Sequence, residues 1–141
     1  MSIVGVDSIA NGIGTGPGVV VWCYREPTGV GANPAGNPFA EWAGSVNGVL
    51  YRRCFDVVQP PACRFPMAAF AQRVPKNRVL ILHDPEVFAD LVEVLPELAK
   101  TCLGHEAQLV LVSESPDYLK RCAAALEPLS EAMPIQRAGA W

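Results

Sequence analysis

Residues 78–92 read RVLILHDPEVFADLV, an apolar run followed at once by an acidic residue and a proline. The run is too short for a helix and is typical of a buried strand. Pro85 suits the first turn of a helix, and the apolar residues among 88–98 fall at helical spacing. We therefore predict a strand followed by a helix, with Asp84 at the carboxyl end of the strand. In open α/β sheets this is the edge at which ligands gather.

The overall composition predicts one globular domain over residues 1–141. Half of the residues are hydrophobic and only 18% are charged, which allows a substantial core. The formal net charge of −3 argues against a protein that binds nucleic acid through charge alone, although it leaves room for a small basic patch. No basic segment precedes an apolar run at the N-terminus, and no apolar run approaches the length of a membrane span. We therefore expect a cytoplasmic protein without a membrane partner.

Cysteine usage points to the same compartment. The chain has five cysteines, an odd number, and none of them form a C-x-x-C pair. Three lie inside apolar runs, where a free thiol behaves as a small hydrophobic group. We therefore predict reduced cysteines that serve mainly in packing.

The first third of the chain predicts strands joined by glycine-rich segments. Residues 2–7 and 19–24 are predicted strands, separated by the glycine-rich residues 11–18. These glycines lead into a β-branched run rather than a helix, and no Gly-Lys-Ser/Thr follows, so neither a dinucleotide fingerprint nor a phosphate loop is present there. A hairpin between antiparallel strands is the simpler interpretation. Residues 27–45 are rich in Pro, Gly and Asn and predict a long loop, and residues 46–58 predict a third strand.

Two aromatic residues, Phe39 and Trp42, lie within the predicted loop. Isolated aromatic side chains are usually buried, so we expect them to pack the loop against the body, although they could instead face a partner.

The rest of the chain predicts helices that alternate with strands. A helix is predicted at residues 66–73, before the strand and helix that begin at residue 78. A second strand–helix unit follows at residues 108–129, and residues 134–141 are predicted to be irregular. The order is therefore β-β-β-α-β-α-β-α. It predicts a mixed five-stranded sheet, with three antiparallel strands and two more that become parallel through right-handed helical crossovers.

This element order is similar to that of the ribonuclease H-like fold. In ribonucleases H the first strand ends in a catalytic aspartate before a glycine-rich turn and a second strand, and Val6-Asp7 and Gly16-Pro17-Gly18 resemble that segment. The family's fourth strand ends in a second catalytic aspartate that opens a helix, which Leu82-His83-Asp84 resembles. The resemblance implies a divalent-metal-dependent nuclease that acts on nucleic-acid phosphodiesters.

The resemblance also implies a metal site. Mg²⁺ or Mn²⁺ ions held by carboxylates on adjacent strands would stabilise the attacking water and the leaving oxygen. Asp7 and Asp84 are the metal ligands that it implies. The family's helix carboxylates have no counterpart at residues 63–69 or 121–124. Four acidic residues are therefore the catalytic candidates, with the last two as substitutes: Asp7, Asp84, Glu114 and Asp117.

Each candidate also has a simpler explanation. An aspartate before a proline is a common helix start, so helix capping alone is a sufficient explanation for Asp84. Asp7 can form a turn with the glycines that follow it. Asp117 suits the positive end of a helix dipole. His83 is either a metal ligand or base, or simply a partly buried strand residue.

Three functions remain open from the sequence. The first is the metal-dependent nuclease. The second is a non-catalytic ribonuclease H-like module that binds a protein or nucleic-acid partner through its sheet and the loop at residues 27–45. The third is a Rossmann-like protein that binds a small ligand at the ends of its two strand–helix units, at Asp84 and residues 113–115.

Overall fold

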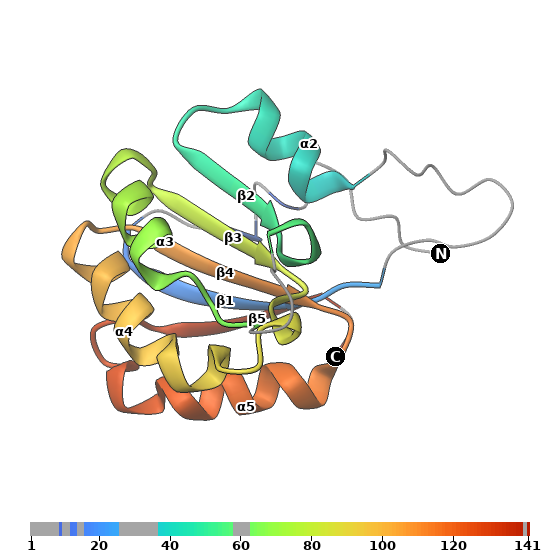
Figure 1. Cartoon of the computed structure of the whole chain (residues 1–141), viewed down its shortest axis with the longest axis vertical. Helices are drawn as coiled ribbons and strands as arrows, with labels where there is room; N and C mark the ends of the chain where they lie inside the picture. Colours follow the sequence, from blue (N-terminus) through green and yellow to red (C-terminus); the bar gives the residue numbers. More distant parts are fainter. Residues whose placement is uncertain (1–8, 10–11, 14–15, 26–36, 58–62, 140) are drawn as a thin grey trace, which may run out of the picture.

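The computed structural model describes residues 9, 12–13, 16–25, 37–57, 63–139 and 141. Five strands and four longer helices alternate along this part of the chain (Figure 1). In chain order they are β1 (Gly18–Cys23), α2 (Pro38–Ser45), β2 (Val49–Arg53), α3 (Met67–Arg73), β3 (Val79–His83), α4 (Leu91–Gly104), β4 (Gln108–Ser113), α5 (Pro116–Leu126) and β5 (Ile135–Gly139). Short 3₁₀ helices are η1 (Cys54–Asp56), η2 (Val74–Lys76), η3 (Pro85–Val87) and η4 (Glu127–Leu129).

All neighbouring strands of the sheet are parallel, in the order β2-β3-β4-β1-β5. The predicted mixed, ribonuclease H-like sheet with three antiparallel strands is therefore wrong. β1 does not pair with β2 but lies between β4 and β5. The predicted strand at residues 2–7 lies outside the described residues.

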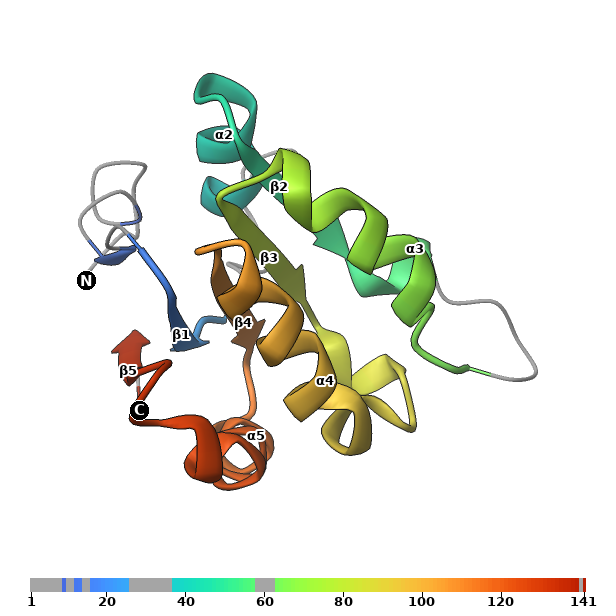
Figure 2. The ribbon, with the colours of Figure 1, turned by 90° about the vertical axis from the view of Figure 1, so that its left-hand side faces the viewer.

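Helices cover both faces of the sheet, as Figure 2 shows: α3, α4 and α5 lie on one side and α2 on the other. The handedness of the crossovers explains this division. The chain moves across the sheet in one direction from β2 to β5, so its right-handed crossovers share one face. The step from β1 to β2 runs in the opposite direction, which places α2 on the opposite face. This doubly wound arrangement is that of Rossmann-like and flavodoxin-like proteins, although their strand orders differ.

The two layers of helices enclose a separate core on each face of the sheet. Leu80, Leu82 and Leu111 pack beneath α4 and α5, whereas Ile81 and Val110 point to the side of α2. Every residue of β1, β3 and β4 is buried. Central strands buried on both faces are the mark of an all-parallel sheet, because crossover helices cover both sides.

Several local predictions are confirmed and others are corrected. Phe39 and Trp42 are buried as expected, but residues 38–45 form helix α2 rather than part of a loop. The helix predicted after Asp84 begins as η3, and α4 starts only at residue 91. Residues 135–139, predicted to be irregular, form β5, whose mixed polarity fits an edge strand.

All five cysteines are free, and four of them are buried, in agreement with the packing role predicted for them. Within the described ranges, no helix is long and apolar enough to cross a membrane.

Candidate functional site

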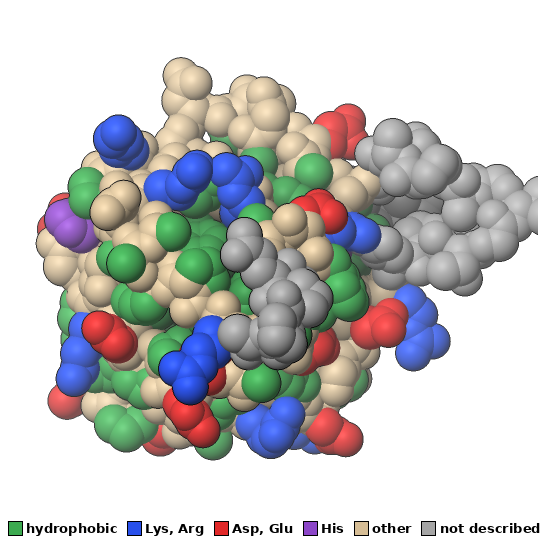
Figure 3. Space-filling model, viewed as in Figure 1, with side chains coloured by type: hydrophobic (Ala, Val, Ile, Leu, Met, Phe, Trp, Pro, Cys, Tyr) green, Lys and Arg blue, Asp and Glu red, His purple; other side chains and the backbone are tan. Residues whose placement is uncertain are grey.

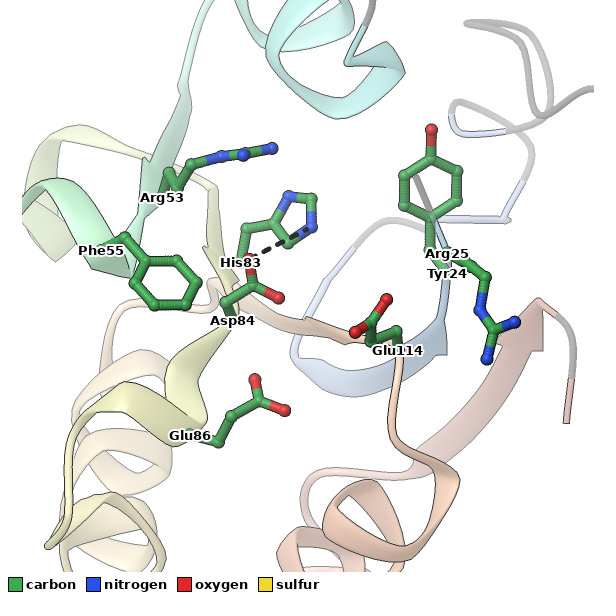
Figure 4. Close-up of a pocket in the computed structure, with 8 residues that line it drawn as sticks. All are labelled: Tyr24, Arg25, Arg53, Phe55, His83, Asp84, Glu86 and Glu114. Carbon is green, nitrogen blue, oxygen red and sulfur yellow. Dashed lines mark ion pairs between the residues drawn. The ribbon is translucent and has the colours of Figure 1, made fainter. Parts of the chain in front are cut away.

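The sheet has one point at which the chain leaves neighbouring strands toward opposite faces. β1 leads to α2 on one face, and its neighbour β4 leads to α5 on the other. Such a switch point opens a crevice beyond the carboxyl ends of the strands, where doubly wound proteins bind ligands. A pocket of about 440 Å³ lies at this edge (Figure 4). Its lining residues are Tyr24, Arg25, Arg53, Phe55, His83, Asp84, Glu86 and Glu114.

The register of the sheet explains why these residues meet. Arg53 pairs with His83 in the last position of β2 and β3, and His83 is level with Val112 in β4. Tyr24 and Glu114 follow directly after the paired ends of β1 and β4. Residues from four segments of the sequence therefore reach one sheet edge because four parallel strands end at the same level.

Asp84 has an unusual backbone conformation at this edge. Its φ of 57° and ψ of 50° are left-handed. That region is uncommon for a residue other than glycine, and a following proline disfavours helical angles further. The Asp84 N–H donates to the carbonyl of Val112 at 2.8 Å, which fixes the turn. Asp84 does precede η3, but its side chain makes no capping hydrogen bond. The helix-cap interpretation therefore does not account for this carboxylate.

Three carboxylates lie around the pocket. Burial raises the pKa of Asp84, and the charges of Glu86 and Glu114 raise it further, while Arg53 acts in the opposite direction. Figure 4 shows Asp84 and Glu114 facing the same space and Arg25 directed outward. The centre of the pocket therefore has more negative than positive charge close to it.

Glu86 is held by the strand-end serine of β4. The Ser113 hydroxyl donates to Oε2 of Glu86 at 2.5 Å, and the N–H of Ser115 donates to Oγ of Ser113 at 3.1 Å. Oε1 of Glu86 is buried without a hydrogen-bond partner among the described atoms. This pair joins the turn after β3 to the turn after β4. Sequence reasoning missed Glu86, although it stands only two residues after Asp84.

His83 forms the buried floor beside Asp84. Only 2% of its surface is exposed, and the rings of Tyr24, Phe39 and Tyr51 meet it edge-on. Burial, aided by the charge of Arg53, lowers its pKa to about 4. Nε2 lies 3.9 Å from Oδ2 of Asp84 (dashed in Figure 4). Because the ring is neutral at pH 7, this contact is not an ion pair.

The structure brings together only part of the predicted site. Asp84 and Glu114 line the same pocket. Asp117 lies exposed on the first turn of α5 and is not among the lining residues, whereas Asp7 lies outside the described residues. Arg53 and Phe55 were not predicted as site residues, because no local pattern in the sequence of β2 indicates its register with β3.

The metal site that the sequence resemblance implied includes Asp7, which lies outside the described residues. Among them, no group of three or more His, Cys, Asp or Glu side chains is arranged to hold a metal ion. Mg²⁺ or Mn²⁺ at Asp7 and Asp84 therefore stays a prediction from the sequence.

No protein-family model, curated protein or solved structure matches this chain. The function therefore has to be inferred from the geometry and chemistry of the pocket itself.

Proposed function

We propose that this protein binds a small organic cation with a planar ring in the pocket at the carboxyl ends of β1 to β4. The observation that carries the proposal is the position of the pocket at the topological switch point, with Asp84 held there in a left-handed conformation. This is the third function considered from the sequence, with its ligand made more specific.

The size of the pocket fits a small molecule. Sites for small ligands and cofactors typically enclose about 300–1,000 Å³ and combine apolar walls with a few placed polar groups. The pocket of about 440 Å³ lies in the lower part of this range, which suits a ligand of one or two rings.

Charge favours a cation over an anion at the centre. Asp84, Glu86 and Glu114 line the pocket, and the last two raise the pKa of the first. A positive group placed among them would favour the charged form of Asp84 instead. Arg53, from β2, partly balances the negative charge of the pocket. It would allow the ligand to carry a polar or acidic substituent as well.

An aromatic side chain at the pocket supports a planar ligand. Phe55 is 60% exposed, although most large apolar side chains of the described chain are buried. Figure 4 shows its ring beside Asp84. A ring stacked on Phe55 would remove apolar surface from water, and its ammonium would remain within reach of the carboxylate.

The helix ends next to the pocket argue against a phosphate ligand. Open N–H groups at a helix N-terminus are the usual phosphate site. Here the Asn37 side chain accepts from the N–H groups of Phe39 and Ala40 at the start of α2. Ser115 accepts from the N–H of Tyr118 at the start of α5. Both helices therefore satisfy these donors internally.

The other two functions lose the structural basis on which they rested. The nuclease and the non-catalytic partner-binding module both assumed a ribonuclease H-like mixed sheet, and the sheet is parallel. On the face seen in Figure 3, acidic and basic side chains of the described residues are interspersed, so charge gives little support to nucleic-acid binding. The nuclease hypothesis can still be tested by titrating the protein with metal ions.

The experiment is a calorimetric titration with matched ligands. Tryptamine carries an ammonium on an indole ring, and indole-3-acetate carries a carboxylate on the same ring. We expect tryptamine to bind at least tenfold more tightly than indole-3-acetate, and Asp84→Asn to weaken that binding at least tenfold. Asp117→Asn, which removes an exposed carboxylate outside the pocket lining, is the matched control and should bind as the wild type does.

Two results would contradict the proposal. One is equal binding of the two indoles, and the other is equal loss of tryptamine binding in both variants. Titration of MgCl₂ and MnCl₂ into the same proteins is the further arm. Binding of a metal that is lost in Asp84→Asn, without binding of tryptamine, would favour the metal site instead.

A further inference from the structure

The orientation of one amide determines the hydrogen bonding below the pocket. The N–H groups of Phe39 and Ala40 lie 2.9 and 3.3 Å from Oδ1 of Asn37. A backbone N–H can only donate, so the atom that it meets must be the amide oxygen rather than the nitrogen. Nδ2 of Asn37 therefore points away from α2, toward Tyr51 and His83.

Nδ2 of Asn37 carries two hydrogens and accepts none, so each of its neighbours must be an acceptor. It lies 2.5 Å from the Tyr51 hydroxyl oxygen and 3.1 Å from Nδ1 of His83. Because Nδ1 of His83 must accept from Nδ2 of Asn37, it carries no proton, so the Tyr51 hydroxyl, 2.6 Å away, donates to Nδ1 while it accepts from Asn37. Two donors converge on Nδ1, which leaves no room for a proton on that nitrogen.

We propose that Asn37 and Tyr51 lock His83 as the neutral tautomer with its proton on Nε2, so that the pocket floor presents a fixed hydrogen-bond donor beside the Asp84 carboxylate. Asn37 and Tyr51 are then positioning residues, which act through His83. Their importance for ligand binding rests on the proposed function, whereas the tautomer itself does not. His83 is in this case neither a general base nor a metal ligand, which rejects the functional interpretation of this residue made from the sequence.

The charged surroundings agree with the locked state. Protonation of Nδ1 would turn two favourable contacts into opposed hydrogens. Among the described residues, the titratable and charged groups that face the ring are Tyr24 from the end of β1, Tyr51 and Arg53 from β2, and Asp84 after β3. Of these described groups, Asp84 is the one that would favour a charged imidazole, and Nε2 lies 3.9 Å from it.

The lock also joins two parts of the fold. Asn37 begins α2 on one face of the sheet, and the same side chain contacts the ends of β2 and β3. The start of the crossover helix α2 thereby contacts the pocket floor, in addition to the packing of Phe39 and Trp42 against the sheet.

The test is ¹⁵N NMR of the histidine rings in the ligand-free full-length protein, with His105→Gln used to assign the two residues. We expect Nδ1 of His83 to be unprotonated and Nε2 protonated, without change between pH 5 and 8. Asn37→Asp is the decisive variant, because aspartate still caps α2 but replaces the donor with an acceptor. It should raise the titration midpoint of His83 by at least one pH unit, a tenfold change in proton affinity. Tyr51→Phe should raise it in the same direction.

A proton on Nδ1 of His83 in the wild type would overturn the proposal. So would a tautomer and titration that are the same in the wild type and in Asn37→Asp. Amide spectra of each variant establish that it is folded. Because no ligand is added, these outcomes are independent of whether the pocket binds an organic cation.

Discussion

The Tyr51 hydroxyl lies 2.6 Å from Nδ1 of His83, across the adjoining ends of β2 and β3. Burial, aided by the charge of Arg53, lowers the pKa of this imidazole to about 4. The unfolded chain has an ordinary histidine of pKa about 6.5. Folding and protonation of His83 therefore oppose each other.

The pH dependence of stability follows from this difference. As the pH falls below about 6.5 the unfolded state takes up a proton that the folded state refuses, so stability falls until about pH 4. Between pH 7 and 4.5 the loss from His83 should be about 2 kcal/mol. Urea unfolding of the wild type and His83→Gln at both pH values measures it. Asp84, whose pKa is raised, acts in the opposite direction in both proteins, so their difference isolates His83. Equal pH dependence in the two would contradict the account.

Asp84→Asn should make the ligand-free protein more stable at neutral pH, by about 1 kcal/mol. The change removes a charge that burial and two neighbouring carboxylates disfavour, and asparagine tolerates the left-handed backbone. Thermal unfolding checks this, with Asp117→Asn as the control. That change removes a first-turn acid and should lower stability slightly. A lower melting temperature for Asp84→Asn would contradict the unfavourable burial and repulsion assigned to the Asp84 charge.

Ser113→Ala should cost about 1–3 kcal/mol, because it removes the only hydrogen-bond donor to the Glu86 carboxylate among the described residues. A double-mutant cycle with Glu86→Ala separates this bond from the packing of either side chain. We expect the double variant to be more stable than the sum of the two single losses predicts. Strictly additive losses would show that the bond contributes nothing to stability.

Gly139→Ala should destabilise β5 by more than about 1 kcal/mol, since a residue with a side chain is strained at this backbone geometry. Gly139 has a φ of +85°, and an added Cβ would collide with the carbonyl oxygen of Cys23 in β1. Gly104→Ala is the matched control, because its Cβ would meet nothing and alanine favours the end of α4. Chemical denaturation of both variants should give opposite signs. Similar effects of the two substitutions on stability would contradict the position of β5 beside β1 at the sheet edge.

Alkylation of the native protein should modify Cys63 first. It is the only one of the five free cysteines that is not buried. Burial raises the pKa of Cys54 and Cys102 to about 12, so these thiols hold little reactive thiolate at pH 8. Peptide mass spectrometry after a short iodoacetamide pulse gives the order of modification. Early labelling of Cys54 or Cys102 would mean that the core opens readily.

The two strand–helix units could be predicted because their signals are local. The apolar run before Asp84 and the Ser115-Pro116 helix start each identify an element without reference to the rest of the chain. The direction of the strands, in contrast, depends on residues far apart in the sequence. The glycines before β1 suggested a hairpin, whereas the unbroken apolar residues 19–23 were the available sign of a parallel strand buried on both faces. β5 carries the polar pattern of an edge strand, which resembles a loop.

The candidate site was likewise predictable only where its residues follow a recognisable strand. Asp84 and Glu114 follow recognisable strands, so the rule for parallel sheet edges applies to them. Arg53 joins them only through the register of β2 with β3, and Asn37 reaches His83 across 46 residues. No local sequence pattern indicates either of these two contacts. The parts of the site that depend on pairing across the sheet therefore required the structure.

The most direct test of the proposed function is an amide NMR titration with tryptamine, which reports both binding and its location. Saturable shifts should be largest at Arg53, Asp84 and Glu114, at the ends of β2, β3 and β4, and should disappear in Asp84→Asn but persist in Asp117→Asn. Shifts centred on another surface, or none at millimolar tryptamine, would contradict the claim that the switch-point pocket binds organic cations.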